Sequence, residues 1–342
     1  MKTPVYRVNS DSQTSLVENV EAVPWWLFDR LPQGFAGRVY AKQVFKQHPE
    51  FSADLRDWSD AVALQLLSEY PVDAIGNLLI GDKDLERYQV AENSPVSLAD
   101  LPRLAEQAKE FCQTLISGDQ PKFCCDIEQH GPCIVKFAET ERQADLLIAE
   151  HTSLSVLNDA GIPAAQTMLV RAGHYQFLVI RRFDCIGSGR RGVVSLKSLD
   201  LEFVGSRDQR WPVIAKQLAE QGAIVVSALP TIQLLFCFGR LIANSDMHSG
   251  NLSFFYDGQM PFALAPAYDQ LPMAYAFGKQ HISQITVDAD LPGSAWAQAL
   301  PLALCFWQTL AEQPLLSESF RNIAAQMLHH VQHDVAVKIR GL

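Results

Sequence analysis

After the first hundred residues, short apolar runs alternate with turn residues. The runs 111–116, 123–129 and 133–137 each have the length of a strand, and the segments 117–122 and 130–132 between them are rich in turn formers. This alternation predicts three successive strands.

A helix and a hairpin are predicted next. Thr140, with Gln143 three residues later, has the spacing of a capping box, and helical periodicity then continues to Gly161, a typical helix end. Residues 164–183 predict a hairpin that turns near residue 172. Three strands, one helix and two strands make a small antiparallel sheet with a helix packed on it, an α+β lobe.

The remainder of the chain has mainly helical periodicity. The predicted helices are 210–227, 229–243, 294–312 and 317–338. Asp257–Gly258, between two apolar runs, predicts one hairpin that interrupts them.

The first hundred residues have a different character and predict a separate subdomain. Residues 58–70 combine a Ser/Asp cap signal with helical spacing, and 74–81 predict a short strand. We therefore expect three parts: an N-terminal subdomain over 1–105, an α+β lobe over 106–183 and a helical lobe over 184–342.

Composition narrows the classes of function. Hydrophobic residues make up 48% and charged residues 19% of the 342 positions, as in a globular protein with ample core material. The net charge of −10, without a basic block, argues against direct binding to nucleic acid. Seven cysteines without a C-x-x-C pair fit a reducing compartment.

No membrane or secretory segment is predicted. The first residues lack an apolar signal-type run, and the most apolar stretch, 294–316, contains Pro301 and Glu312. We expect buried helices there and a cytoplasmic protein.

The polar run Asn-Ser-Asp-Met-His-Ser-Gly-Asn at 244–251 interrupts two core-type segments. A hairpin centred on Asp257–Gly258 would place Asn251 opposite about residue 264, at the hairpin's open end and near Asp269. Asp246, Asn251 and Asp269 would then converge. Three oxygen-bearing side chains suit Mg²⁺ and suit zinc poorly.

Asp-x₄-Asn followed by a later Asp is also the spacing of a kinase catalytic loop. The α+β lobe offers the complementary groups. Loop 117–122 presents backbone N–H groups to phosphates, Lys136 is a lone cation on a strand, and Glu150 in the next helix is its expected partner. The chain passes between the lobes near 179–185, where adenine would bond to the backbone.

These segments resemble the HipA-type serine/threonine kinases, the toxin halves of bacterial toxin–antitoxin pairs. The resemblance covers nearly the whole chain, with its motifs in family order. The segments that carry it are WWLFDRLPQGFAGR (25–38), SGDQPK (117–122), VKF (135–137), AEH (149–151), RRFD (181–184), NSDMHSGN (244–251) and APAYD (265–269).

The resemblance implies a bilobal protein-kinase-like fold that uses ATP and Mg²⁺. Asp246 would be the catalytic aspartate, with His248 orienting it or the phosphate, and Asn251 and Asp269 would hold the metal. The residues expected at the nucleotide are Lys136, Glu150, Ser117, Gly118, Gln120, Lys122, Arg181 and Phe183.

The family's regulation and partners are implied in the same way. Ser117 matches a serine that some relatives autophosphorylate, whereas the more usual serine position is Leu115 here. Arg181 replaces the family's hinge glutamate, and Cys185 replaces the arginine after the hinge aspartate. A protein substrate such as an aminoacyl-tRNA synthetase or another translation factor, and an antitoxin partner, are expected.

Two other functions share parts of this pattern. A small-molecule kinase of the aminoglycoside or choline type has the same Asp-x₄-Asn…Asp arrangement, but its usual His-Gly-Asp is Asn244-Ser245-Asp246 here. A nucleotide-binding pseudokinase would act by protein interaction, although every catalytic residue type is present. The histidines in 328–334 predict an amphipathic terminal helix rather than a metal site.

Overall fold

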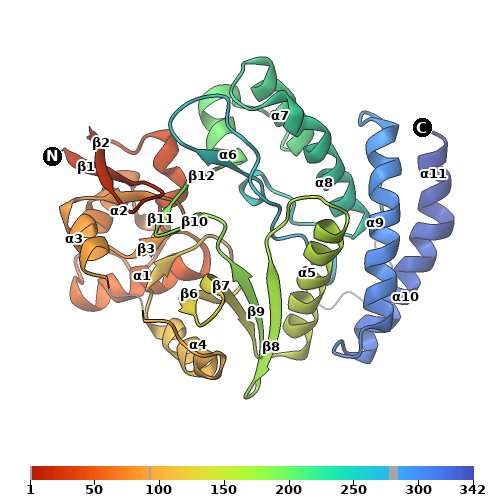
Figure 1. Cartoon of the computed structure of the whole chain (residues 1–342), viewed down its shortest axis with the longest axis horizontal. Coiled ribbons are helices and arrows are strands. Elements are labelled where there is room, and N and C mark those ends of the chain that lie inside the picture. Colours follow the sequence, from red (N-terminus) through yellow and green to blue (C-terminus); the bar gives the residue numbers. More distant parts are fainter. Residues whose placement is uncertain (1, 92–93, 277–283) are drawn as a thin grey trace. The chain divides into compact units, whose positions relative to one another are not determined.

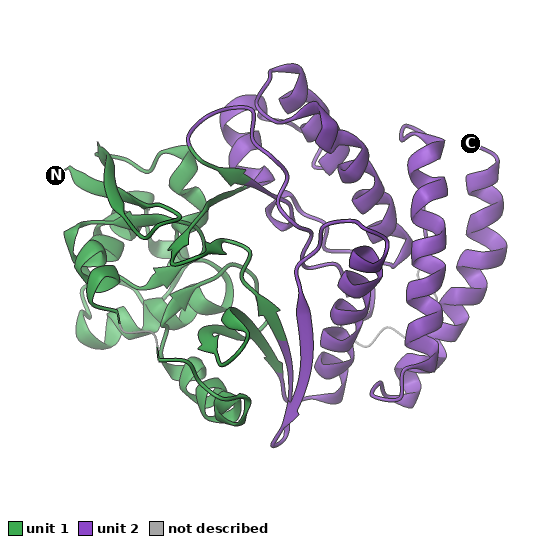
Figure 2. Ribbon diagram, in the orientation of Figure 1, with its two compact units in different colours: residues 1–137, 179–194, 255–257 green, residues 138–178, 195–254, 258–342 purple. Residues whose placement is uncertain are grey.

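The computed structural model describes residues 2–91, 94–276 and 284–342. The chain divides into two compact units (Figure 2). Unit 1 comprises residues 1–137, 179–194 and 255–257, and unit 2 comprises 138–178, 195–254 and 258–342.

Unit 1 begins with a three-stranded sheet of order β2-β1-β4, in which β1 is antiparallel to both neighbours. The strands of this sheet are β1 (Thr3–Val8), β2 (Thr14–Val20) and β4 (Leu78–Ile80). The helices of the unit are α1 (Gly34–Gln47), α2 (Asp60–Glu69), α3 (Asp82–Val90) and α4 (Leu101–Glu110). Val5, Tyr40 and Leu66 are fully buried where this sheet and α1 and α2 meet, in one apolar core.

The predicted pairing of the first strand of the α+β lobe, 111–116, is wrong. Only Thr114–Leu115 (β5) is extended, and it pairs in parallel with β3 (Asp73–Ala74) rather than with the strands that follow it. Helix α4 ends at Glu110, and residues 111–113 between it and β5 are in neither helix nor strand, so only two of the six predicted residues form a strand.

The other four predicted strands form one sheet of order β6-β7-β9-β8. They are β6 (Lys122–Ile127), β7 (Gly131–Ala138), β8 (Thr167–Ala172) and β9 (Tyr175–Arg181). The division into units follows β7 at Phe137 and passes through β9 after Leu178. Further along the chain come the short strands β10 (Cys185–Ile186), β11 (Gly189–Arg190), β12 (Gly192–Ser195) and β13 (Ser253–Tyr256).

Unit 2 is mainly helical, as the periodicity predicts. Its helices are α5 (Glu141–Asp159), α6 (Leu196–Leu199), α7 (Trp211–Glu220), α8 (Leu229–Leu241), α9 (Gly293–Glu312), α10 (Glu318–His330) and α11 (Ala336–Arg340), with π-helical turns at Asp200–Val204 and Val331–Val335. Helix α9 packs against α5, α8 and α10 (Figure 1). No helix in the described part of the chain is long and apolar enough to cross a membrane, and all seven cysteines are free.

Three indoles tie the helical core to backbone carbonyls. Trp211, Trp296 and Trp307 are fully buried, and each donates its Nε1–H to a carbonyl at 3.0 Å. A buried indole with a satisfied N–H contributes apolar burial without an unpaired donor. The acceptors are the carbonyls of His248, Asp288 and Leu241, so two of the three bonds hold the end of α8 and the polar segment after it.

Helix α5, which carries Glu150, is joined to α10 through a buried carboxylate. Asp145 accepts the backbone N–H of Ser317 at 2.9 Å and its hydroxyl at 2.7 Å. Ser317 is also the N-cap of α10 and accepts from the N–H of Phe320 at 3.2 Å. Burial raises the pKa of Asp145, and the bonds from Ser317 counteract that rise in part.

Ser317→Ala should lower the free energy of unfolding by about 2–3 kcal/mol, because it removes a helix cap and leaves a buried carboxylate less satisfied. The loss should be larger at about pH 8 than at about pH 5, because the ionised form of Asp145 bears the cost. Urea unfolding at both pH values measures this. Ser59→Ala, which removes a cap without a buried carboxylate partner, should cost about 1 kcal/mol with no such pH dependence. Equal losses at both pH values would contradict the role given to Asp145.

Candidate active site

The polar segment 244–251 follows α8 through a Schellman turn. The N–H of Asn244 donates to the carbonyl of Gly239 at 2.8 Å, and the N–H of Ala243 donates to that of Arg240 at 3.1 Å. Ala243 takes the left-handed conformation, with φ of +59°, where glycine is usual. The turn ends the helix abruptly and satisfies two of its last carbonyls.

Amide side chains bring the predicted metal-site residues together. Asn251 Nδ2 donates to the carbonyl of Asp246 at 2.9 Å, and Asn244 Nδ2 donates to the carbonyl of Asp269 at 3.3 Å. The N–H of Asp246 donates to Asn244 Oδ1 at 3.1 Å. The Asp246 side chain is exposed, and its carboxylate accepts no hydrogen bond from any residue that the structure describes.

The donor set suits a hard divalent cation. Asp269 has φ of +53°, a conformation that aspartate tolerates better than most residues. Within the described residues, no three His, Cys, Asp or Glu side chains group as a metal site. Carboxylate and amide oxygens are the ligands that Mg²⁺ takes while it keeps waters, and a magnesium site at Asn251 and Asp269 stays a prediction.

His248 contacts its own loop. Its Nδ1 accepts the N–H of Gly250 at 3.1 Å, and its carbonyl accepts the indole N–H of Trp211 at 3.0 Å. The bond from Gly250 to the ring makes the His248 side chain the cap of the short turn Ser249–Asn251. A role for its ring toward Asp246 or a phosphate stays a prediction.

The predicted register of the hairpin after 251 is wrong by three residues. Phe254 pairs with Leu264, and the N–H of Ala265 donates to the carbonyl of Ser253 at 2.9 Å, whereas a tight turn at 257–258 would pair Phe254 with Pro261. Pro261 has no N–H to donate to a ladder, so the pairing begins beyond it. Tyr268 closes the open end, with its hydroxyl donating to the carbonyl of Gly250 at 2.9 Å.

Loop 117–122 lies in unit 1, and two of its polar side chains donate to backbone carbonyls. Lys122 Nζ donates to the carbonyl of Ser117 at 2.6 Å, and Gln120 Nε2 donates to that of Phe137 at 2.8 Å. Ser117 is exposed, and Gly118 has φ of +97°, which only glycine adopts readily.

Two buried lysines are direct cross-strand partners in the sheet. Lys122 on β6 faces Lys136 on β7, and the two residues are 5% and 6% exposed. Like charges in this arrangement repel, so the position favours a negatively charged group nearby. Val135 and Phe137 are also buried, so both faces of β7 are covered. Glu150 on α5 is 1% exposed but lies in the other unit, and its pairing with Lys136 stays a prediction.

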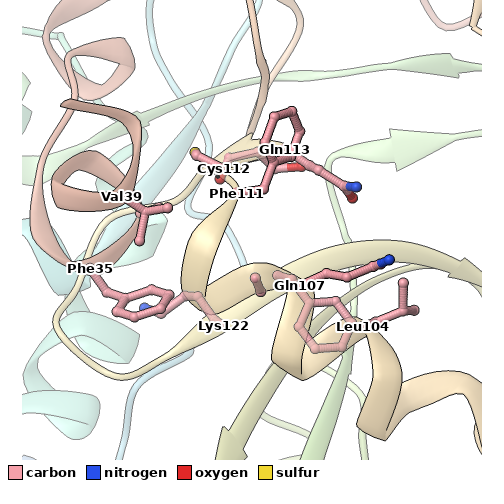
Figure 3. Close-up of a pocket in the computed structure, with 12 residues that line it drawn as sticks. Phe35, Val39, Leu104, Gln107, Phe111, Cys112, Gln113 and Lys122 are labelled. Carbon is pink, nitrogen blue, oxygen red and sulfur yellow. Dashed lines mark hydrogen bonds between the residues drawn. The ribbon is translucent and has the colours of Figure 1, made fainter. Parts of the chain in front are cut away.

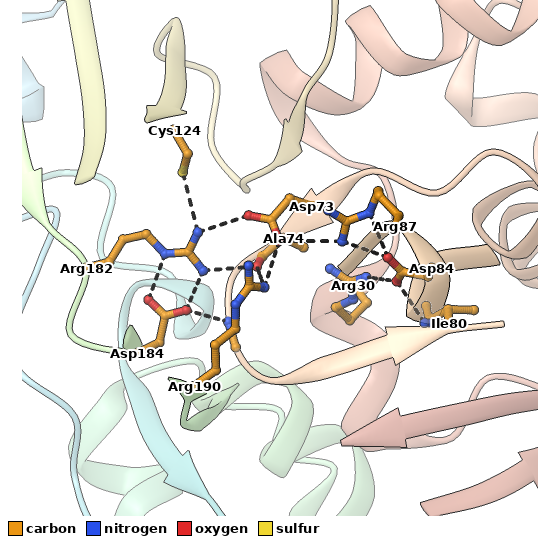
Figure 4. Close-up of polar contacts among 11 residues, drawn as sticks. Arg30, Asp73, Ala74, Ile80, Asp84, Arg87, Cys124, Arg182, Asp184 and Arg190 are labelled. Atoms are coloured by element: carbon orange, nitrogen blue, oxygen red, sulfur yellow. Dashed lines mark hydrogen bonds and ion pairs between the residues drawn. The ribbon is translucent and has the colours of Figure 1, made fainter. Parts of the chain in front are cut away.

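The segment predicted to contact adenine is anchored by residues that the sequence did not single out. Arg181 is exposed, and Phe183 packs edge-to-face on Phe255 with ring centroids 6.1 Å apart. Arg182, which lies between Arg181 and Phe183 in the sequence, makes two hydrogen bonds to Asp184, at 3.1 and 2.6 Å (Figure 4). Asp184 in turn accepts the N–H of Gly76 at 2.8 Å.

Asp73 is the centre of a buried arginine cluster in unit 1. It lies 3.1 Å from Arg182, 2.7 Å from Arg190 and 3.7 Å from Arg87 (Figure 4). Burial alone would raise the pKa of Asp73, but the guanidiniums of Arg190, Arg182 and Arg87 more than offset it and hold the pKa well below its usual range. The motif Arg-Arg-Phe-Asp at 181–184 was the sequence feature that could have pointed to this buried cluster. Nothing in the motif identifies Asp73 as the residue that pairs with Arg182.

Comparison with known proteins identifies relatives over most of the chain. Residues 114–335 match the family described as HipA-like C-terminal domain, and residues 3–89 match the YjjJ-like toxin, middle domain. A protein of Escherichia coli (strain K12) named Toxin YjjJ is 37% identical, over 92% of this chain and 76% of its own length.

Two solved structures are similar to this chain. HipA of Shewanella oneidensis MR-1, in a complex with HipB and operator DNA, matches with a TM-score of 0.56 at 14% identity, over 100% of this chain and 97% of its own. The Helicobacter pylori proinflammatory kinase CtkA covers 64% of this chain and 95% of its own, with a TM-score of 0.49 at 15% identity. The predicted α+β, bilobal kinase-like fold is confirmed by the HipA match.

Asp73→Asn should lower the free energy of unfolding by about 3–5 kcal/mol near neutral pH, because Arg182 and Arg190 lose a buried counter-charge. When folding lowers the pKa of a carboxyl, that carboxyl stabilises the folded state at pH values above its pKa in the unfolded chain, about 3.9 for aspartate. This contribution is lost as the pH falls below that value. The wild type should therefore lose stability between about pH 5 and pH 3, and the variant should lose less. Denaturant unfolding across this range measures both effects.

Asp54→Asn is the matched control, because Asp54 pairs with Arg56 on the surface, where solvent screens the interaction. Hydrogen bonds from Arg56 lower the pKa of Asp54 to about 2, but in this exposed pair solvent screening keeps the effect small, so the acid dependence should change much less than in Asp73→Asn. If Asp73→Asn and the wild type lose stability equally in acid, Asp73 is not the group that titrates.

Proposed function

The chain belongs to the family of HipA-like C-terminal domains, and we propose that it is an ATP- and Mg²⁺-dependent protein kinase. It would transfer the γ-phosphoryl group to a serine or threonine hydroxyl of a bacterial protein. The observation that carries the proposal is the exposed Asp246 carboxylate on a loop whose backbone is bonded to Asn251, with Asp269 tied to the same loop.

Asp246 is suited to receive a proton from an acceptor hydroxyl. Its backbone is held from both sides, by Asn244 and by Asn251, so its carboxylate faces outward from a rigid turn. In the transfer, the hydroxyl oxygen forms a bond to the γ-phosphorus, and the bond between the γ-phosphorus and the oxygen that bridges to the β-phosphate breaks. The hydroxyl proton passes to Asp246, and ADP leaves.

The other residues would bind and position the nucleotide. Mg²⁺, when bound by Asn251 and Asp269, neutralises charge on the phosphates. Lys136, with Glu150 as its partner, would hold the α- and β-phosphates, and loop 117–122 would cover the β/γ end. Residues 181–183 would offer backbone groups to adenine, on a segment that the Arg182–Asp184 pair keeps in place.

The biological setting follows from the relatives' names and is part of the proposal. The E. coli relative is named a toxin, and HipA of S. oneidensis forms a complex with HipB and operator DNA. We expect this chain to be the toxin-like component of such a pair. With a net charge of −10, it would depend on an antitoxin partner for contacts to DNA.

Asp246→Asn should reduce phosphoryl transfer by about 100- to 10,000-fold while ATP affinity is unchanged, because the amide cannot accept the proton. Purified wild type and variant are incubated with radiolabelled ATP, Mg²⁺ and a lysate of the host, and labelled proteins are identified by phosphoproteomics. Asp159→Asn, at the exposed end of α5, is the matched control and should keep full activity.

Two results would contradict the proposal in different ways. A fully active Asp246→Asn variant would remove the role of Asp246. A wild type that labels small amines and no protein would indicate a small-molecule kinase instead.

A further inference from the structure

The first turn of α1 is capped by the loop that we propose to bind phosphates. Its N-cap residue, Gln33, makes no side-chain capping bond. The N–H of Phe35 instead donates to the carbonyl of Gly118 at 3.0 Å. The first N–H groups of a helix lack partners within it, so this carbonyl satisfies one of them at the positive end of the helix.

Gly34 makes this contact possible. Its φ is +63°, and a Cβ at this position would lie 2.4 Å from the carbonyl oxygen of Gly118 and 2.8 Å from its carbonyl carbon. Such distances require the backbone of one segment to move. Any side chain at residue 34 would therefore push the loop away from α1.

A second tether holds the preceding carbonyl. Lys122 Nζ donates to the carbonyl of Ser117 at 2.6 Å. Phe35 and Lys122 lie beside each other and line the same cavity of about 20 Å³ (Figure 3). Arg38 also reaches Asp119 at 2.7 Å, but both side chains are more than half exposed, so that pair adds little.

The bonds to the carbonyls of Ser117 and Gly118 also set the directions of the N–H groups in the same two peptide planes, those of Gly118 and Asp119. In a planar trans peptide, the C=O and the following N–H point in opposite directions. The N–H of Gly118 therefore faces away from Lys122, and the N–H of Asp119 faces away from α1. Neither N–H donates to a residue that the structure describes. Successive free N–H groups in a turn are typical binding groups for phosphate oxygens.

We propose that Gly34 is a positioning residue of the nucleotide site. The N-terminus of α1, together with Lys122, holds loop 117–119 in the conformation that presents its N–H groups to the β- and γ-phosphates. The N-terminal part of unit 1 is then needed to build the phosphate site, and α1 would act on the nucleotide through loop 117–119. This inference rests on the proposed function.

The test compares nucleotides that differ only in their phosphates. Gly34→Ala should weaken Mg-ATP binding by about tenfold or more and leave AMP binding unchanged, because the displaced loop serves the β/γ end. Isothermal titration calorimetry measures both affinities, and the KM for ATP should rise more than kcat falls. Gly205→Ala is the matched control, with the same φ of +63° and nothing within 4 Å of an added Cβ. It should leave the ratio of ATP to AMP affinity at the wild-type value.

A second pair of variants keeps the test valid if Gly34→Ala does not fold. Phe35→Pro removes the N–H that bonds to Gly118, at a helix position where proline is tolerated, and Phe35→Ala keeps it. Proline should weaken ATP binding selectively relative to alanine. If the wild type binds no ATP, the proposed function fails. If the wild type binds ATP but Gly34→Ala, or the proline variant, keeps the wild-type ratio of ATP to AMP affinity, the positioning role fails alone.

Discussion

Backbone carbonyls held by distant donors determine the shape of both loops of the candidate site. In unit 2, the carbonyls of Asp246, His248 and Gly250 accept from Asn251, Trp211 and Tyr268. In unit 1, the carbonyls of Ser117 and Gly118 accept from Lys122 and the N–H of Phe35. Each of these bonds restricts its loop to a narrower set of conformations. The groups suited to chemistry, the Asp246 carboxylate and the loop N–H groups, are left facing outward.

Charge is used differently in the two units. Unit 1 concentrates arginines around Asp73 and Asp184, where they join the segment 182–190 to β3. Removing one member leaves an uncompensated buried charge, so the cluster is sensitive to single substitutions. Unit 2 relies mainly on buried aromatic rings, with one buried carboxylate, Asp145, between α5 and α10.

Local sequence patterns predicted the structure correctly where residues adjacent in the sequence determine it. The cap of α5 at Thr140, the end of that helix at Gly161 and the β6–β7 turn all follow short-range rules. The prediction for 111–116 was wrong because strand pairing is a tertiary choice: β5 pairs with β3, which precedes it by about forty residues. The hairpin register after 251 was wrong because Pro261 delays the ladder.

The sequence by itself determined the helical and strand periodicity, the family to which the chain belongs and which residue types could carry phosphoryl transfer. Only the tertiary structure decided which donors reach which carbonyls. Asp246 and Asn251 are close enough in the sequence for the hydrogen bond that joins them. Trp211, Tyr268 and Gly34 instead contact loop residues that lie 18 to 84 positions away in the chain. Spacing along a chain encodes contacts within a turn or two of structure, whereas these bonds depend on how separate elements pack.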